Sequence, residues 1–409
     1  MFLRRSRVTV ALAAALAFSA VLAACGSDGG SGGGDSDTIK IGNWVSVSGS
    51  GFDFIAPQVK AGAEAAISSI NATGGINGRN LELSFCDQKF DPNQEVTCAR
   101  QMVSDNVSAV VAPSVFFGAG SIPILERAKI PVLASQGLSP NVEYTCATCY
   151  PLGGSYGWYW GVDYALLKAG ATKFSILGVT NATSVEASNI ALAGLEAAGI
   201  TDVPTINADG NATDLAPQAS QAMANGVDGI VLTVSPQLQT KAIAALRDGG
   251  YTGKIGTITD LLSQDAIDGL GSKADGVVLS SLVSFPNDEA NPGVTEFQAD
   301  MAKYAPDAVT DTLGLEAWAA VKLFATIAKS TDSYDAAGIL EAIKNTDLTD
   351  AEAPVFGGFV IKGATSPVPD MPQLLITNAQ IGEVVKGVPT AQGPLLNVVD
   401  ALNNWNSSN

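Results

Sequence analysis

The chain has 409 residues, 46% of them hydrophobic and 15% charged, so it has apolar material for more than one core and should divide into two domains. Acidic residues outnumber basic ones by 40 to 22, a formal net charge of −18. This argues against nucleic acid as a partner, because affinity for phosphate needs clustered Lys and Arg. Histidine is absent, which removes the commonest general base and metal ligand.

Residues 1–24 have the pattern of a secretory signal peptide, with three arginines, an apolar run over 8–22 and small residues before Cys25. A cysteine at this place resembles the lipoprotein box of bacteria, which implies that Cys25 is lipidated; an ordinary signal with a chance cysteine is the alternative. Residues 25–37 follow as a flexible tether of Gly, Ser and Asp. We therefore expect a protein secreted across the cytoplasmic membrane and lipid-anchored on its outer face.

Residues 56–113 predict a helix, a tight turn, a strand, a second helix and a second strand. An apolar stripe at helical spacing runs over 59–70, and apolar residues alternate with polar ones over 81–85. Asp91, followed by proline, is typical of a helix N-cap, and 109–112 reads as a strand buried on both faces. Strands that alternate with amphipathic helices indicate an α/β fold, doubly wound around a parallel central sheet.

Three motifs in this stretch carry a resemblance: G-A-E-x-A-I at 62–67, I-N-x-x-G-G-I-N-G at 70–78 and D-P-x-x-x-x-x-x-A-R at 91–100. In this order and spacing they closely resemble the N-terminal lobe of the leucine/isoleucine/valine-binding protein family. Its members are type I periplasmic binding proteins, the solute receptors of ABC importers. A weaker match in length and element order runs from Thr38 to about Asp400.

The resemblance implies two doubly wound lobes joined by a three-crossing hinge. Further strands are expected over 38–45, 130–134, 174–179, 229–234, 255–258 and 277–281. Further helices are expected over 184–198, 217–225, 236–247, 263–270, 294–304, 313–329 and 336–344. We assign 38–150 and 284–355 to the N-terminal lobe and 151–283 and 356–402 to the C-terminal lobe. Two lobes on a hinge can close around a ligand.

Loops after the C-terminal ends of parallel strands are where α/β sheets bind ligands. The first such loop supplies Ser48, Phe52 and Phe54, and Trp44 lies near the end of its strand. We predict that these four residues line the ligand site. The alternative for the aromatic rings is packing beneath a helix.

The next two loops, 114–120 and 135–139, hold the ligand's carboxylate and amino group in the resembled family. The ligand-binding candidates in them are Phe116, Phe117, Gly118, Gln136 and Gly137. The two phenylalanines stand where amino-acid binders tend to have Ser or Thr. This departure favours a larger or more apolar ligand.

Three loops of the second lobe contribute Thr183, Ser235 and Asp260 as candidates. By resemblance, an acidic residue near the last loop holds the ligand's amino group, and Asp260 is the nearest one. Its alternative role is to cap the helix over 263–270. The family's usual Tyr-Gly after the first strand of this lobe is missing, since Thr183 and Ser184 stand there.

Four cysteines remain after Cys25, an even number for an oxidising compartment, and three connectivities are possible. The layout of Cys86 and Cys98 resembles the family's bridged pair, so we pair these two and, with them, Cys146 and Cys149. A redox role for the second pair is disfavoured, because it lies in a loop and does not open a helix after a strand.

The sequence favours a binding protein over an enzyme. It has no G-x-S-x-G, no phosphate loop and no metal-ligand spacing, so we expect no catalytic residue, metal or cofactor. The resemblance implies a monomer that passes a small-molecule ligand to an ABC permease and its ATPase. The ligand would be a branched-chain or other apolar or aromatic amino acid, or a related amide or acid. A ligand sensor that docks on a membrane signalling partner is the alternative.

Overall fold

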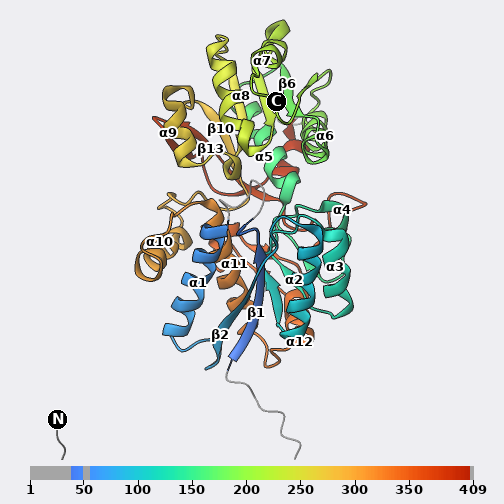
Figure 1. Cartoon of the computed structure of the whole chain (residues 1–409), viewed down its shortest axis with the longest axis vertical. Coiled ribbons are helices and arrows are strands. Elements are labelled where there is room, and N and C mark those ends of the chain that lie inside the picture. Colours follow the sequence, from blue (N-terminus) through green and yellow to red (C-terminus); the bar gives the residue numbers. More distant parts are fainter. Residues whose placement is uncertain (1–37, 49–55, 406–409) are drawn as a thin grey trace, which may run out of the picture. The chain divides into compact units, whose positions relative to one another are not determined.

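The computed structural model describes residues 38–48 and 56–405, which belong to one compact unit. Two large sheets, each with its own helices, organise these residues (Figure 1). The predicted signal, Cys25, the tether, Phe52 and Phe54 lie outside the described residues.

The first sheet has five parallel strands in the order β2-β1-β3-β4-β5. They are β1 Thr38–Val45, β2 Asn80–Asp87, β3 Ala109–Val111, β4 Val132–Leu133 and β5 Cys149–Tyr150. Side chains of β1 point alternately to the two faces, so that Ile39 and Ile41 join one apolar core while Trp44 joins another with Met102. Helices therefore cover both faces of this sheet, as a doubly wound fold requires.

The helices of this lobe include two sets, and the members of each set pack on one another. They are α1 Ala56–Ala72, α2 Pro92–Ser104, α3 Gly118–Arg127, α4 Pro140–Glu143, α10 Pro292–Tyr304, α11 Thr312–Ala328 and α12 Ala336–Lys344. Helix α2 packs on α3, whereas α1 packs on α10 and α11, which lies beside it in Figure 1. A glycine at position 62 permits the close approach of α1, because a Cβ there would collide with the backbone oxygen of Gly314.

The second sheet has the order β14-β13-β10-β9-β8-β6-β7, with β15 paired to β13. Its strands are β6 Phe174–Val179, β7 Thr205–Ala208, β8 Gly229–Thr233, β9 Lys254–Ile258, β10 Val277–Ser281, β13 Asn378–Val385, β14 Val388–Ala391 and β15 Leu396–Asn397. The strands from β6 to β10 pair in parallel, as predicted. The last three pair antiparallel, and neither they nor β7 were predicted from sequence.

Six helices accompany the second sheet. They are α5 Gly154–Lys168, α6 Ala182–Ala197, α7 Ala216–Ala222, α8 Pro236–Asp248, α9 Gln264–Leu270 and α13 Val398–Asn403. Helix α5 packs against β9, β10 and β13, which explains why its aromatic first turns are buried. A small hairpin is formed by β11 Asp347–Leu348 and β12 Phe359–Val360. Short 3-10 turns lie at η1 Ala224–Gly226, η2 Thr259–Leu261, η3 Gly271–Lys273 and η4 Pro354–Phe356.

The chain passes between the two sheets three times. It leaves the first sheet after β5, returns after β10 to form α10 to α12, and reaches the second sheet again with β13. The predicted fold class, two doubly wound lobes with three connections, is confirmed. The lobe boundaries assigned from the sequence stay a prediction.

Helix starts follow the capping chemistry expected from sequence. Asp91 accepts a hydrogen bond from Gln94 N at 2.8 Å, with Pro92 at the first helical position, as predicted. Asp311 and Asp335 cap α11 and α12 in the same way. Local residue choice therefore sets where these helices begin.

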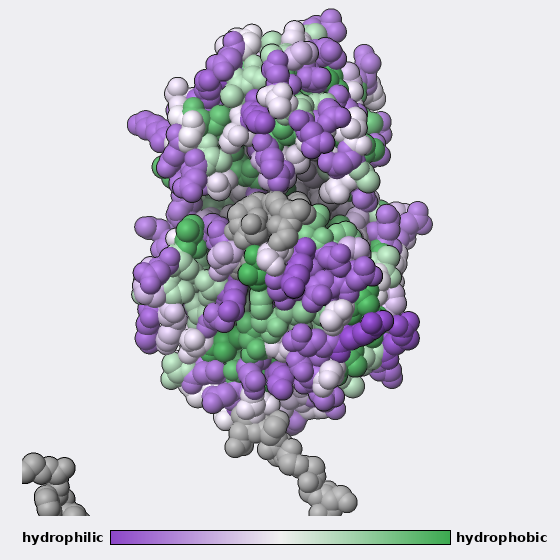
Figure 2. All heavy atoms as spheres, in the orientation of Figure 1, coloured by the Kyte–Doolittle hydropathy of each residue, from purple (hydrophilic) through white to green (hydrophobic). Residues whose placement is uncertain are grey.

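The molecular face in Figure 2 carries hydrophilic residues interspersed with hydrophobic ones, and hydrophobic residues gather in the lower half of the view. Among the helices that the structure describes, none combines the length and the apolar character that crossing a membrane requires.

Candidate functional site

The loop after β1 is held by the carboxylate of Asp87 at the end of β2. Its Oδ1 accepts from Val47 N at 2.9 Å and Ser48 N at 3.4 Å, and its Oδ2 accepts from Ser48 Oγ at 2.7 Å. Although burial alone would raise the pKa of Asp87, the hydrogen bonds from Ser48 and Val47 lower it overall. The predicted ligand residue Ser48 is thus exposed but already bonded within the chain.

Trp44 has a structural place beneath these loops. Its ring has no exposed surface, and its Nε1 donates to Ser114 O at 3.1 Å. A ligand could touch this ring only after a rearrangement. The structure therefore supports the packing alternative for Trp44, in place of a role as a pocket wall.

The loop after β3 is organised around the buried carboxylate of Glu95 on α2. Glu95 Oε2 accepts from Phe116 N and Phe117 N, each at 3.0 Å, and its Oε1 accepts from Ser121 Oγ at 2.6 Å. Burial raises the pKa of Glu95, although these hydrogen bonds oppose the rise. The Glu95 carboxylate thus accepts the hydrogen bonds that this loop would otherwise donate to solvent or to a ligand.

Phe116 and Phe117 are partly buried, and both rings contact Phe90. The ring centroids lie 4.9 Å apart for Phe90 and Phe116 and 5.3 Å apart for Phe90 and Phe117. The first pair is edge-to-face and the second is tilted, and these contacts give the three rings one shared apolar surface beside the strand ends. A ligand contact of these rings stays a prediction.

A second buried carboxylate, Glu143, holds the loop after β4. Its Oε2 accepts from Ser139 N at 2.7 Å, and burial raises its pKa to about 7. Ser139 Oγ joins the loops after β3 and β4, because it donates to Val115 O at 2.9 Å and accepts from Gly118 N at 3.1 Å. Gly137 has φ 65°, and a Cβ there would collide with the Tyr144 hydroxyl, so this loop needs glycine.

Gln136 lies between two carboxylates and connects the two lobes. Its Nε2 donates to Asp260 Oδ2 at 3.1 Å and to Glu316 Oε2 at 2.6 Å. Gln136 follows β4, Asp260 lies in the turn η2 after β9, and Glu316 lies in α11. The two predicted candidates, Gln136 and Asp260, are therefore brought together across 124 residues of sequence.

Asp260 does not cap the following helix. Ser263 is the N-cap of α9, and its Oγ accepts from Ala266 N at 3.3 Å. Asp260 accepts from Thr259 Oγ1 at 3.0 Å and from Gln136. Of the two roles that the sequence left open, the structure removes the cap, and the role of Asp260 in holding a ligand's amino group stays a prediction.

Asp260, Asp311 and Glu316 form an acid cluster, and we use this name for the three residues below. Burial raises the pKa of Asp260 to about 7 and that of Asp311 to about 6. Burial also raises the pKa of Glu316 well above its usual value, and the negative charges of Asp260 and Asp311 add to that rise. The three carboxyl groups therefore keep their protons to higher pH than free carboxyl groups do, and a positive charge close to them would favour their deprotonated forms.

A cavity of about 300 Å³ opens beside this cluster. Asp260, Asp311 and Gln58 supply polar atoms to its wall, and apolar side chains that include Leu262 and Leu313 supply the rest. Its size is at the lower end of the roughly 300 to 1,000 Å³ usual for ligand pockets. The arrangement suits a small, partly apolar molecule.

Thr183 and Ser235, the two other candidates from the second lobe, lie elsewhere in the hydrogen-bond network. Thr183 is exposed in the first turn of α6, and Ser235 is the N-cap residue of α8. Neither side chain, both within the described residues, is hydrogen-bonded to Gln136 or Asp260. Their role in ligand binding stays a prediction.

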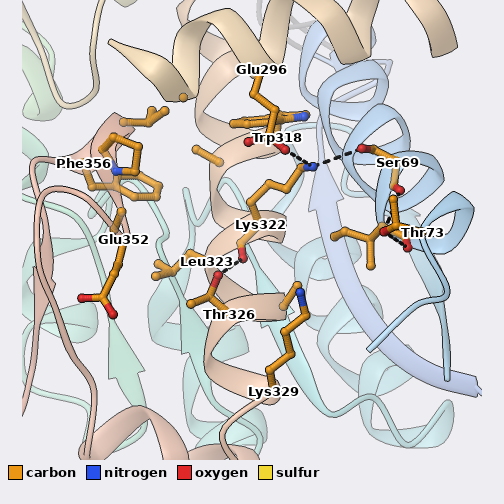
Figure 3. Close-up of a pocket in the computed structure, with 17 residues that line it drawn as sticks. Ser69, Thr73, Glu296, Trp318, Lys322, Leu323, Thr326, Lys329, Glu352 and Phe356 are labelled. Carbon is orange, nitrogen blue, oxygen red and sulfur yellow. Dashed lines mark hydrogen bonds and ion pairs between the residues drawn. The ribbon is translucent and has the colours of Figure 1, made fainter. Parts of the chain in front are cut away.

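A second cavity, also of about 300 Å³, lies between α1, α10, α11 and the segment 352–356 (Figure 3). The amine of Lys322 is 2.8 Å from Glu296 Oε1, 3.1 Å from Asp300 Oδ2 and 3.1 Å from Ser69 Oγ. This lysine is thus already paired. The lining comes from the last turns of α1 and the middle of α11, so we assign this cavity to helix packing.

Both predicted disulfides are present. Cys86 is bonded to Cys98 and Cys146 to Cys149. The first ties the end of β2 to α2, and the second closes the short loop before β5.

Sequence reasoning missed four carboxylates that shape the site: Glu95, Glu143, Asp311 and Glu316. One signal was available for Glu316, because it is the single acidic residue in the otherwise largely apolar helix TLGLEAWAAVKLFATIA. An isolated acid in such a helix is expected to have a specific partner or a functional role. Glu95 and Glu143 gave no comparable signal.

The family model described as periplasmic binding protein matches residues 38–369. The chain is 25% identical over 331 residues to the Leu/Ile/Val-binding protein BraC3 of Rhizobium johnstonii, a match that covers 75% of this chain and 83% of that protein. It is 36% identical over 99 residues to Leu/Ile/Val-binding protein homolog 3 of Brucella melitensis, over 22% of this chain and only 27% of that relative's length.

Solved structures show the same fold. The leucine-binding protein LivK of Thermotoga maritima has a TM-score of 0.70 at 18% identity, with 88% of this chain and 99% of that chain covered. A solute-binding protein of an ABC transporter from R. palustris, in complex with 4-hydroxybenzoate, has a TM-score of 0.69 at 17% identity, with 88% and 97% covered. With a family match over most of its length, this chain belongs to the periplasmic binding protein family, in the leucine/isoleucine/valine-binding group that its motifs resemble.

Proposed function

We propose that the protein is an extracytoplasmic solute receptor of an ABC importer, anchored through a lipid on Cys25. It closes two lobes over a small organic ligand and delivers that ligand to a membrane permease and its ATPase. It acts as a monomer and performs no catalysis. Family membership and the names of the relatives, which are binding proteins, support this assignment.

The observation that carries the proposal is the hydrogen bond between Gln136 and Asp260. Each residue follows the C-terminal end of a parallel strand, one in each sheet, which is where α/β sheets bind ligands. A ligand held by both loops would gain contacts to both lobes, and its binding would favour the closed arrangement.

We infer a ligand of the class that the sequence suggested, a small molecule with an apolar or aromatic body related to amino acids, amides and acids. The cavity of about 300 Å³ and the apolar surface of Phe116, Phe117 and Phe90 support an apolar body. The relatives named after leucine, isoleucine and valine are consistent with this size.

One substitution tests the aromatic contact. Phe116→Ala should weaken ligand binding by more than about tenfold if its ring is buried against the ligand, because truncation of a buried aromatic costs roughly 3 kcal/mol or more. Leu192→Ala on α6, which packs on the core away from these loops, is a control for loss of stability. Unchanged affinity would show that the Phe116 ring is not buried against the ligand.

Uptake tests the function directly. A strain that lacks the protein should lose uptake of the labelled ligand and regain it with the wild-type gene. Replacing Cys25 by Ala should move the protein from the membrane fraction to the medium or soluble fraction. Normal uptake without the protein, together with a lost transcriptional response to the ligand, would instead favour a sensor.

A further inference from the structure

Several backbone N–H groups of the first-lobe loops around the candidate site are already hydrogen-bonded to carboxylates of the protein. Asp87 accepts N–H groups from the loop after β1, Glu95 from the loop after β3 and Glu143 from the loop after β4. Glu95 and Glu143 are fully buried. A ligand carboxylate would have to compete with these internal carboxylates, and like charges at close range repel strongly.

The opposite side of the site has more hydrogen-bond acceptors than donors. The acid cluster of Asp260, Asp311 and Glu316 makes no salt bridge with Lys or Arg among the ion pairs of the described residues. Glu316 is only 5% exposed, and its Oε1 has no hydrogen-bond partner within the described part of the chain. A buried carboxylate with an unpaired oxygen is costly unless a donor or a cation reaches it.

Thr259 Oγ1 donates to Asp260, and Gly314 N donates to Asp311. The donor that Asp260 and Glu316 share is the amide of Gln136. It provides two hydrogens from one nitrogen, to Asp260 and Glu316 at 3.1 and 2.6 Å. An ammonium group provides three hydrogens from one nitrogen, together with the missing positive charge. The geometry around Gln136 is therefore that of a site for a primary amine.

The cavity beside the acid cluster is lined by Asp260 and Asp311 and, on its wall, by Gln58, whose buried Oε1 also has no partner among the described residues. Apolar side chains such as Leu262 and Leu313 complete the wall. Within the described residues, no group of three or more His, Cys, Asp or Glu is placed to hold a metal ion, so an organic cation is the better match.

We propose that the ligand is a small organic amine with an apolar body and without a carboxylate group, held at its ammonium by the acid cluster. This inference rests on the proposed receptor function and narrows its ligand class. The sequence resemblance alone implied an acidic residue for an amino group, with a carboxylate bound in the first lobe. Because Glu95 and Glu143 already accept hydrogen bonds from N–H groups of the first-lobe loops, we expect an amine in place of an amino acid.

Matched ligands with one body test the proposal. The purified protein from Gly26 onward is titrated calorimetrically, and its thermal midpoint is measured, with 3-methylbutylamine, leucine and 4-methylpentanoate. 2-Phenylethylamine, phenylalanine and isovaleramide are run beside them. The amines should bind at least about tenfold more tightly than the amino acids that add a carboxylate, because that group would lie near buried like charges.

Each outcome has a distinct meaning. If leucine or phenylalanine binds as tightly as its amine, or if 4-methylpentanoate binds best, the ligand inference is wrong and the receptor function stands. If only the neutral amide binds, the ligand inference is also wrong. If calcium or magnesium chloride stabilises the protein and the amines do not, the acid cluster is a metal site. If none of these compounds binds, both the ligand inference and the proposed ligand class fail.

Two neutral, nearly isosteric variants test whether the acid cluster binds the ammonium group. Asp260→Asn and Glu316→Gln should each weaken amine binding by about tenfold or more, because each removes one charge that pairs with the ammonium. Asp307→Asn, an exposed residue outside the cavity lining, is the matched control and should bind as the wild type does. Circular dichroism checks folding, and amine affinity that is unchanged in both cluster variants overturns the assignment.

Discussion

The buried carboxyl group of Glu143 should make the protein less stable as pH rises, and Glu143→Gln should remove this part of the pH dependence. Burial raises the pKa of Glu143 from 4.5 to about 7 in the folded protein. The folded state therefore binds more protons than the unfolded state between these two pH values. Stability must fall as pH rises through this window, and it is highest below it.

The magnitude follows from the size of the shift. A rise of the pKa from 4.5 to about 7 corresponds to about 3 kcal/mol over the whole window, most of which falls between pH 5 and pH 8. No discount for solvent is needed, because Glu143 has no exposed surface. Glutamine does not titrate, and its amide oxygen can keep the bond from Ser139 N.

Urea unfolding at pH 5, 6, 7 and 8 measures the effect. The free energy of unfolding of wild type should fall by about 2 to 3 kcal/mol more than that of Glu143→Gln between pH 5 and pH 8. Asp260 and Asp311 add losses of the same sign to both proteins, so the difference between the two isolates Glu143. The exposed Glu82→Gln variant should follow the wild type. Equal losses in wild type and Glu143→Gln would refute the reasoning.

Two further predictions concern packing and covalent links. Gly62→Ala should destabilise the protein by about 1 to 3 kcal/mol in urea unfolding, because its Cβ would collide with the backbone oxygen of Gly314. Gly314→Ala should cost less, because its Cβ would approach the backbone oxygen of Gln58 only to 3.3 Å. Equal effects of the two alanines would contradict the proposed contact between α1 and α11. Replacing both Cys86 and Cys98 by Ala should cost about 3 kcal/mol, and removing the bridge within 146–149 about 2 kcal/mol, because the first closes the longer loop. The reverse order of the two losses in thermal or urea unfolding would contradict this explanation.

Much of the fold could be read from local sequence. The helix over 92–104 begins where Asp91 and Pro92 predict it, because an N-cap is a contact between residues a few positions apart. The strand over 174–179 and the helix over 336–344 have the predicted bounds. The disulfide partners followed from a family resemblance whose motifs lie within 62–100, and the structure confirms them.

The late strands were missed because no local rule determines them. The segment over 378–385 becomes β13 only because the edge of β10 offers an antiparallel partner, about 100 residues earlier in the chain. Trp44 was assigned to the ligand site because it is aromatic and lies near a strand end. Its side chain instead points into the buried core that it shares with Met102 of α2, on the face opposite to Ile39 and Ile41, as the alternation along β1 requires.

The sequence by itself determined the family, the parallel α/β pattern and the loops in which ligand residues should be sought. Tertiary structure alone decided the chemistry of the site, because hydrogen bonds and burial depend on which distant groups meet. Gln136 bonds to residues 124 and 180 positions away, and Glu95 reaches the loop after β3 across a helix and a strand. These contacts occupy several N–H donors of the first-lobe loops, and they leave Glu316 Oε1 without a hydrogen-bond partner among the described residues.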